Sequence, residues 1–290
     1  MSKQIKNVLL LLLVAIIWGF AFSAQRVGAT TLAPFTLYAF RSYASVLTLF
    51  VFFLFSRRLS DKRNISYSIK AGIILGVIEF LAGITQQIGI IYTTASNSSF
   101  ITATYVIMVP VISFFFGNKT DKKVWFCVVL ELIGLYLLCV KGDFTINKGD
   151  LLTLLCAFLF AVHIIQIDRA KKADTILMCL VQFVICAILS TICMFIFELP
   201  VDFDGVYNAT IPILYTGILS SGLCVTIQAT VQKELDPTLA SIIMCLESVF
   251  GAIGGWLILH EVLSTRELIG CALAFVAILI SQLPSKKESK

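Results

Sequence analysis

Five side chains with readily ionisable groups lie within long apolar stretches of the 290-residue chain: Arg41, Glu79, Glu131, His163 and Glu247. A charged group at the depth of a bilayer core is costly, so such groups usually face the protein interior, a partner or a water-filled cavity. Carboxylates and an imidazole in that setting can orient a polar solute or carry a proton, and a cation can hold an anionic group. These residues therefore mark where the chain could do chemistry.

Glu247 lies near the middle of an apolar stretch that runs from Leu239 to Glu261, LASIIMCLESVFGAIGGWLILHE. About 20 apolar residues at ~1.5 Å each cover a hydrocarbon core ~30 Å thick. Gly251 and Gly255 follow Glu247 at four-residue steps, so the three share one helix face. Small residues at that spacing let a neighbouring backbone approach closely. We therefore predict that this helix lines the working cavity of a transporter.

A second acid, Glu79, belongs to a polar stripe at helical spacing with Gly83, Gln86 and Gln87. A cavity wall explains a polar helix face inside a membrane better than contact with lipid does. Glu79 is therefore predicted to handle a substrate or a proton, with a purely structural, hydrogen-bonded acid as the alternative.

The other polar groups leave two interpretations open. Glu131 lies in a segment that is otherwise nearly all apolar, which favours a structural role or a contact between two copies. Arg41 could neutralise Glu79 or Glu131, which we favour because an unpaired buried charge is costly, or it could attract an anionic group of a substrate. His163 could shuttle protons or be only hydrogen-bonded. Trp18 could stack on a ligand or only pack.

The composition indicates the kind of structure that must position these groups. The chain is 59% hydrophobic and 13% charged, with a mean hydropathy of +0.96, whereas soluble domains have roughly 25% charged residues. It is therefore expected to be an all-α polytopic membrane protein. Pro110 lies well inside an apolar segment, so the fourth helix is expected to be kinked toward its second end. Ten apolar segments indicate ten transmembrane helices, at about residues 8–25, 34–55, 69–91, 96–116, 122–140, 150–167, 176–197, 211–232, 238–259 and 266–283.

The basic residues of the loops predict an orientation. With ten segments alternating across the bilayer, 17 of the 22 Lys and Arg residues fall on one side and 4 on the other, with Arg41 inside a span. The positive-inside rule makes the crowded side cytoplasmic. We therefore expect a multi-pass protein of the cell membrane with both termini in the cytoplasm, including a short tail at residues 285–290.

An internal repeat organises the ten segments. A shift of 142 residues without a gap superimposes the first five on the last five, and it places Gln86 on Gln228 and Tyr105 on Glu247. Tyr105 would thus offer a phenolic hydroxyl opposite Glu247. Because each half has an odd number of spans, the second half must enter the membrane from the opposite side. Two inverted five-helix repeats are the plan of many secondary transporters, whose sites lie near the midplane between the halves. The two predicted domains are residues 1–140 and 150–284.

Several chemistries lack the residues that they require. His260-Glu261 begins like the zinc-protease motif HExxH, but Ser264 stands at the second histidine position. No phosphate-binding P-loop motif suggests ATP as an energy source. The nine cysteines fall inside apolar segments without CxxC spacing, which favours apolar packing over a metal site or disulfides. We therefore expect no enzyme activity, no metal or other cofactor, and no nucleic-acid partner.

Several longer motifs extend this interpretation to almost the whole chain, about residues 8–283. They are Trp18-Gly19, Pro34 with Arg41, the run 83–113, and LESVFGAIGGWLILHE at 246–261 followed by Gly270. These motifs resemble the drug/metabolite transporter superfamily, specifically its ten-helix proteins with two EamA domains. The last motif resembles the family's leucine-glutamate-proline-valine-phenylalanine signature and closing glycine-glutamate, with three departures. Ser248 replaces the proline, so this helix is expected to be straighter than usual; His260 replaces the glycine, and Asn118-Lys119 stands where the first half usually has glycine-glutamate.

The resemblance implies alternating access through a central cavity, with the fifth and tenth helices at the periphery. Family members typically export amino acids or other small metabolites. The chain is therefore predicted to be a secondary or facilitative exporter of a small polar metabolite such as an amino acid, with proton coupling left open. The alternatives are a carrier of lipophilic drugs or nucleosides, a membrane-embedded enzyme and a non-transporting sensor. Its expected partners are a small-molecule substrate, the lipid bilayer and, in a homodimer, a second copy. The substrate site is predicted to contain Trp18, Glu79, Gln86, Tyr105, His163, Gln228 and Glu247.

Overall fold

Long apolar stretches without strand-like alternation fold into helices throughout the described part of the chain. The computed structural model describes residues 3–56, 64–115, 122–139, 148–261 and 264–282. The predicted tail at 285–290 and Asn118-Lys119 lie outside these ranges. The elements are α1 (Lys3–Gly28), α2 (Pro34–Ser56), α3 (Ile65–Tyr92), α4 (Ala95–Ala103), α5 (Tyr105–Phe115), α6 (Lys122–Cys139), α7 (Lys148–Arg169), α8 (Thr175–Phe197), α9 (Phe203–Asn208), α10 (Thr210–Leu214), the π-helix η1 (Tyr215–Cys224), α11 (Val225–Val231), α12 (Pro237–Met244), α13 (Glu247–Leu259) and α14 (Thr265–Gln282).

Eight helical segments among the described residues are long and apolar enough to cross a bilayer. α1, α2, α3, α7 and α8 are single helices, and three spans are composite: α4 with α5, α10 through α11, and α12 with α13. α6 and α14 occupy the fifth and tenth predicted segments but are not among the eight. Lys122 and Lys123 open α6, and Arg266 lies in the first turn of α14. The structure thus shows an all-helical protein with eight candidate spans.

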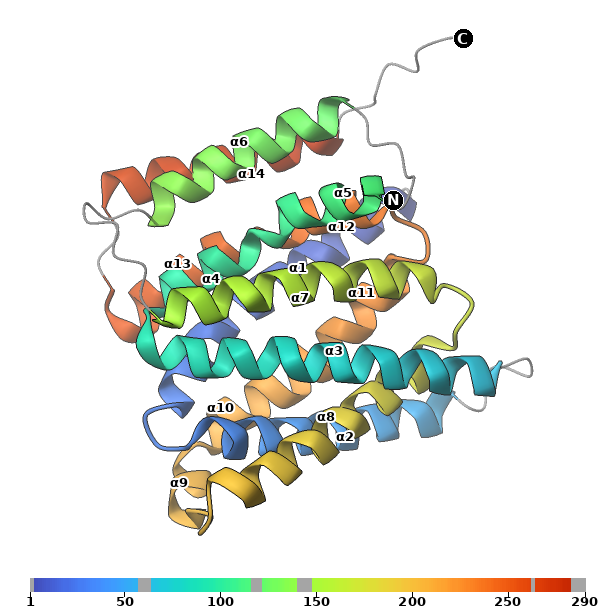
Figure 1. Ribbon diagram of the computed structural model, residues 1–290. Coiled ribbons are helices and arrows are strands. Elements are labelled where there is room, and N and C mark those ends of the chain that lie inside the picture. Colours follow the sequence, from blue (N-terminus) through green and yellow to red (C-terminus); the bar gives the residue numbers. More distant parts are fainter. Residues whose placement is uncertain (1–2, 57–63, 116–121, 140–147, 262–263, 283–290) are drawn as a thin grey trace.

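The helices lie side by side with their axes roughly along one direction (Figure 1). α6 packs against α14 at one edge of the bundle, and α2 packs against α8 toward the opposite edge. Between these pairs, α3 packs against α7 and α8, and α1 packs against α13. The outer place of α6 and α14 confirms the expected periphery of the fifth and tenth segments. The remaining helices surround the middle of the bundle.

Two spans are interrupted near their middle, each immediately before a predicted site residue. α4 ends at Ala103 and α5 begins at Tyr105, and α12 ends at Met244 and α13 begins at Glu247. Interrupted helices expose backbone groups and re-aim side chains at membrane depth, which is tolerated where the segment lines a cavity. The interruptions therefore place Tyr105 and Glu247 at the ends of helices that face the bundle interior.

The expectation that the ninth segment is a straighter helix is wrong, although Ser248 does replace the proline. Ser248 Oγ donates a 2.8 Å hydrogen bond, and Cys245 Sγ a 2.9 Å bond, to the carbonyl group three residues earlier. Such local bonds compete with the regular helical pattern and bend helices. The fourth segment is interrupted at Thr104, before Pro110 and not toward its second end. Thr104 Oγ1 likewise donates to the carbonyl three residues earlier, at 2.6 Å.

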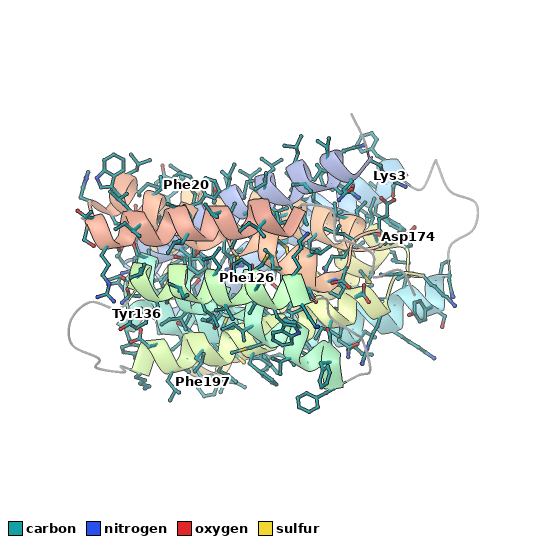
Figure 2. All side chains as sticks on the ribbon, turned by 90° about the horizontal axis from the view of Figure 1, so that it is seen from above. Lys3, Phe20, Phe126, Tyr136, Asp174 and Phe197 are labelled. Atoms are coloured by element: carbon teal, nitrogen blue, oxygen red, sulfur yellow. The ribbon has the colours of Figure 1, made fainter. Side chains whose placement is uncertain are left out.

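The outside of the bundle is apolar and the inside carries polar groups. Side chains project all round the bundle (Figure 2), and Phe126 and Phe197 are 58% and 69% exposed. Glu79, Gln87 and His163, in contrast, are buried. Extended exposed apolar surface indicates contact with something other than water. The arrangement fits a bundle surrounded by lipid that keeps its polar groups for the interior.

Candidate functional site

A cavity of about 50 Å³ lies among the central helices. Its lining residues come from α1, α2, α3, α5, α7, η1, α11 and α13, which span both halves of the chain. A single water needs roughly 10–15 Å³ on this measure, so the space accommodates only a few waters. The structure brings all seven predicted site residues to this one cavity: Trp18, Glu79, Gln86, Tyr105, His163, Gln228 and Glu247.

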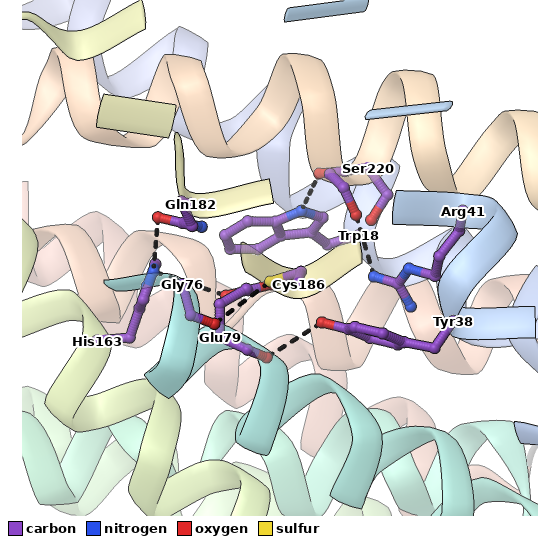
Figure 3. A network of polar contacts seen from close by, with 10 residues as sticks. Trp18, Tyr38, Arg41, Gly76, Glu79, His163, Gln182, Cys186 and Ser220 are labelled. Atoms are coloured by element: carbon purple, nitrogen blue, oxygen red, sulfur yellow. Dashed lines mark hydrogen bonds and ion pairs between the residues drawn. The ribbon is translucent and has the colours of Figure 1, made fainter. Parts of the chain in front are cut away.

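Glu79 and His163 form a buried pair across the α3–α7 contact. Glu79 Oε2 lies 3.6 Å from His163 Nε2, which also lies 3.3 Å from Gln182 Oε1 on α8. The three residues are at most 4% exposed, and Figure 3 shows them on one side of the polar network. The predicted polar stripe on α3 faces the interior, because Gln86 and Gln87 are buried together with Glu79. The arrangement can hold a proton between an acid and an imidazole, or only hold three helices together.

Arg41 lies at the other side of the same network (Figure 3). Its Nη1 donates to Gln25 Oε1 at 3.2 Å and its Nη2 to Ser221 Oγ at 3.1 Å. The guanidinium carbon also lies 4.8 Å from the centroid of the Tyr38 ring. Among the described side chains, no carboxylate lies within ion-pair distance of Arg41. One of the two expected pairings of Arg41, that with Glu79, is therefore wrong, and Glu79 lies beside His163 instead.

The expectation that Glu131 could neutralise Arg41 cannot be placed in the same way. Glu131 lies on α6, and its side chain lies outside the described part of the structure. Its interpretation as a structural residue or a contact between two copies stays a prediction.

Amide groups extend the network from Arg41 through α1 and α3 to α4. Gln25 Nε2 on α1 donates to Gln86 Oε1 on α3 at 3.2 Å, and Gln86 Nε2 donates to Thr102 Oγ1 on α4 at 3.2 Å. With Arg41, this chain of side chains links α2, α1, α3 and α4. Buried amides act as both donors and acceptors, so the same groups can exchange partners with a polar solute.

Trp18 contacts the π-helix η1 in the facing half. Its indole nitrogen donates a 2.9 Å hydrogen bond to the backbone oxygen of Ser220. A π-helix changes the hydrogen-bond register of a helix and is frequent at functional sites. Here it presents Ser220 to Trp18 and the neighbouring Ser221 to Arg41. The indole is both a packing group and a wall of the cavity.

Glu247 opens α13 beside the cavity and is 3% exposed. Tyr105 lines the same cavity, and Glu247 Oε1 has no hydrogen-bond partner among the described atoms. The close approach of a neighbouring helix, predicted at Gly251 and Gly255 on the same helix, is confirmed. A methyl group at Gly251 would meet Ser99 Oγ on α4 at 2.3 Å, and one at Gly255 would meet Ser96 Oγ at 2.8 Å.

Three polar groups of the cavity wall were not placed in the predicted site, namely Gln25, Ser220 and Ser221, although the sequence shows Ser221 in a weak polar stripe with Cys224 and Gln228. Gln25 is a single amide near the end of an apolar segment, where polar residues ordinarily mark the membrane surface. Ser220 and Ser221 lie between Gly217 and Gly222, and this cluster of small residues was the available signal for an irregular helix.

Carboxylates bind two helix N-termini at the end of the bundle where α1 stops. Glu261 Oε2 accepts from Ser96 Oγ and, at 3.4 Å, from the Ser96 backbone nitrogen. Glu198 accepts from the Thr36 backbone nitrogen at 2.6 Å and from Thr36 Oγ1 at 2.7 Å. An anion at a helix N-terminus satisfies unpaired N–H groups and the helix dipole. Each contact ties one predicted half to the other.

The opposite end of the bundle is also closed by contacts between the halves. Lys3 Nζ lies 2.8 Å from Glu234 Oε1, and Asn7 donates to the same carboxylate at 3.0 Å. The hydrogen bond from Lys3, followed by that from Asn7, lowers the pKa of Glu234 below its usual value. Ser68 Oγ accepts from the backbone nitrogen of Asp174 at 2.8 Å. Polar contacts thus join the two predicted halves at both ends of the bundle.

We predict that Glu261→Ala loosens the α4 N-terminus. Hydrogen exchange of the Ser96 amide should accelerate about 10- to 100-fold, because hydrogen bonds to charged groups contribute roughly 1.5–3 kcal/mol. The measurement is exchange mass spectrometry in detergent. Glu198→Ala is the matched control, since it should loosen the α2 N-terminus around Thr36 and leave Ser96 unchanged. Equal exchange at Ser96 in wild type and Glu261→Ala would show that this contact does not hold the end closed.

Comparisons with known proteins point to one family. The model of the EamA-like transporter family matches residues 5–140 and 147–283. An uncharacterised transporter of Archaeoglobus fulgidus is 28% identical over 280 residues, which cover 94% of this chain and 84% of that protein. The uncharacterised transporter YoaV of Bacillus subtilis is 25% identical over 287 residues, with 96% and 97% covered. A crystal structure superimposes with a TM-score of 0.79 at 17% identity and covers 96% of this chain and 98% of that one, which shows a shared fold.

Proposed function

Because the chain belongs to the EamA-like transporter family, we propose that it is a secondary or facilitative exporter of a small polar metabolite, with amino acids and their relatives as first candidates. Relatives named as transporters make an enzyme the less favoured class. One observation carries the substrate class. Two buried acids, an arginine, a histidine and several amides meet at one cavity in the middle of the bundle. Charged and polar side chains at the depth of a membrane core cost free energy, so those that are present usually serve a function.

We further propose that the chain has ten spans in two inverted repeats, with α6 and α14 as the fifth and tenth. The spacing of the helices supports the repeat: α4 begins at residue 95 and α12 at 237, and α5 begins at 105 and α13 at 247. The fourth span of each half is therefore interrupted at the same place. Sites of such transporters form where discontinuous helices of the two repeats meet.

Solute movement would require the bundle to open. The cavity of about 50 Å³ is far below the ~300 Å³ of ordinary small-molecule sites. The proposal is that the halves rock against each other, that the contacts of Glu261 and Glu198 break when one end opens, and that the contacts of Lys3 break when the other end opens. Both termini would lie in the cytoplasm and the protein in the cell membrane, as the distribution of basic residues indicates.

A carrier of lipophilic drugs or nucleosides is the second candidate, because four cavity residues are aromatic. Trp18, Phe22, Tyr105 and Phe160 would offer flat surfaces to a planar solute. The polar groups outnumber these rings, and we therefore favour the polar metabolite.

The proposal is tested by counterflow into proteoliposomes with labelled amino acids, nucleosides and organic cations. Saturable uptake of amino acids is expected. Uptake confined to nucleosides or lipophilic cations would favour the second candidate. No flux of any solute, with binding of a solute intact, would indicate a sensor in place of a transporter.

The proposed topology makes a separate prediction about the linker at residues 141–149. Five spans in the first half place this linker outside the cell, whereas four spans would leave it in the cytoplasm. We expect alkaline phosphatase, which is active only outside, to be active when fused within the linker, and a cytoplasmic fluorescent reporter to fluoresce after Lys290. An inactive phosphatase at the linker, with the fusion protein present, would contradict the ten-span arrangement.

A further inference from the structure

The ionisable groups of the cavity can be paired one by one. Four readily ionisable side chains line the cavity: Arg41, Glu79, His163 and Glu247. Glu79 Oε2 lies 3.6 Å from His163 Nε2, and no ion pair joins Glu79 to Arg41 among the described side chains. Arg41 and Glu247 are left without a partner of opposite charge among the described side chains. The cavity therefore contains one unmatched cation and one unmatched acid.

Arg41 is held in place but not neutralised. It is 6% exposed, and its contacts are an amide oxygen, a hydroxyl and an aromatic ring, from Gln25, Ser221 and Tyr38. A guanidinium has five N–H donors in a rigid fork, and these described partners accept only two of them. The free-energy cost of removing a charge from water is offset only when a well-placed opposite charge is present. A carboxylate can occupy the remaining donors of the fork.

Glu247 shows the complementary deficit. It is 3% exposed, and its Oε1 has no hydrogen-bond partner among the described atoms. Tyr105 is the neighbour of this carboxyl group, and it cannot supply a positive charge. A buried acceptor without a partner is costly, and a native structure that retains one calls for an explanation. An ammonium group of a solute would satisfy it.

We propose that Arg41 receives the anionic group of the transported solute and Glu247 its cationic group, so that the site selects zwitterions over the corresponding amine or acid. This rests on the proposed function and adds the residues that decide between charge types. Gln25 and Ser221 position the guanidinium fork. A solute with only one charge leaves either Arg41 or Glu247 unmatched.

The test uses purified full-length protein in detergent and sets of three probes with one side chain. One set is L-phenylalanine, phenethylamine and 3-phenylpropionate; a second is L-leucine, 3-methylbutylamine and 4-methylpentanoate. Affinities are measured by calorimetry for wild type, Arg41→Gln and Glu247→Gln. In wild type, we expect the amino acid to bind at least about tenfold more tightly than either analogue, the scale of one charge-assisted hydrogen bond.

Each variant should remove one side of that preference. Arg41→Gln should bind the amino acid and the amine about equally, and its affinity for the amine should stay within about threefold of wild type, since the amine never used the guanidinium. Glu247→Gln should lose the preference over the acid in the same way. Arg169→Gln, an exposed arginine outside the cavity, is the matched control and should keep both preferences.

Three results would overturn the proposal: amine and amino acid binding equally in wild type, Arg41→Gln keeping the wild-type preference, or no amino acid of either set binding. If Arg41→Gln does not fold, Arg41→Lys decides the point, because it keeps the charge without the fork. Its preference over the amine should fall without vanishing, and an unchanged preference would assign Arg41 a structural role. Counterflow of the same amino acids is run in parallel. Charge-selective binding without flux would contradict transport and leave this recognition standing.

Discussion

Replacing Glu79 with alanine is expected to lower the free energy of unfolding by about 1–3 kcal/mol, the range for leaving a buried polar group without its partner. Glu79 and His163 are 4% and 2% exposed, and their polar atoms lie 3.6 Å apart. Without the carboxylate, the His163 ring keeps only its contact with Gln182. The measurement is thermal or denaturant unfolding of the purified protein in one detergent.

A double-mutant cycle separates this pair from simple loss of packing. Glu79→Ala and His163→Ala together should cost less than the sum of the two single changes by about 1–3 kcal/mol, because the second change removes a group that the first left unpaired. Glu234→Ala removes the carboxylate of an exposed pair with Lys3 and should change stability little. Additive single effects would contradict the buried pair.

The second large effect is expected from Gly19→Ala, which adds one methyl group where α1 crosses α13. That methyl would lie 2.4 Å from Phe250 Cβ, 2.7 Å from the Phe250 carbonyl carbon and 2.8 Å from the backbone oxygen of Glu247. Two of these neighbours are backbone atoms, so the helices must separate. Overpacking of this kind costs about 1–3 kcal/mol or more, and it would also displace Glu247 from the cavity. Lower unfolding temperature and reduced transport should therefore appear together.

Gly254→Ala on α13 is the matched control for that change. Its methyl group would meet side-chain atoms, with Ser23 Oγ nearest at 3.0 Å and Phe20 Cδ1 at 3.3 Å. These side chains can move by a few tenths of an ångström, so stability should change much less than with Gly19→Ala. Equal losses in the two variants would mean that the α1–α13 crossing is not specially close.

The sequence predicted much of the site because burial of a polar group in a membrane is costly and leaves few places for it. Glu79, His163 and Glu247 come from distant segments, and each was expected to face the interior. The 142-residue repeat also predicted that Tyr105 belongs to the site, although tyrosine is not one of the charged residue types. Hydrophobic segments likewise predicted the positions of the helices.

The parts that the sequence did not predict depend on tertiary contacts or on single hydrogen bonds. Arg41 was expected to pair with an acid, but which groups meet across four helices cannot be read from the order of residues. The π-helix η1 differs from an α-helix by one residue in hydrogen-bond register, and hydrophobic spacing does not report that difference. The break before Glu247 does not require a proline, because Cys245 and Ser248 supply side-chain hydrogen bonds that compete with the helical pattern.

The central claim is that a solute crosses the membrane through the cavity at Glu247. Its most direct test is counterflow of labelled amino acids into proteoliposomes that contain equal amounts of wild type or Glu247→Gln, with folding of both checked by their unfolding temperatures. We predict saturable flux in wild type and a loss of at least about tenfold in the variant, because the solute loses a buried charged partner. Equal flux through the two proteins would contradict the claim and leave Glu247 a structural residue.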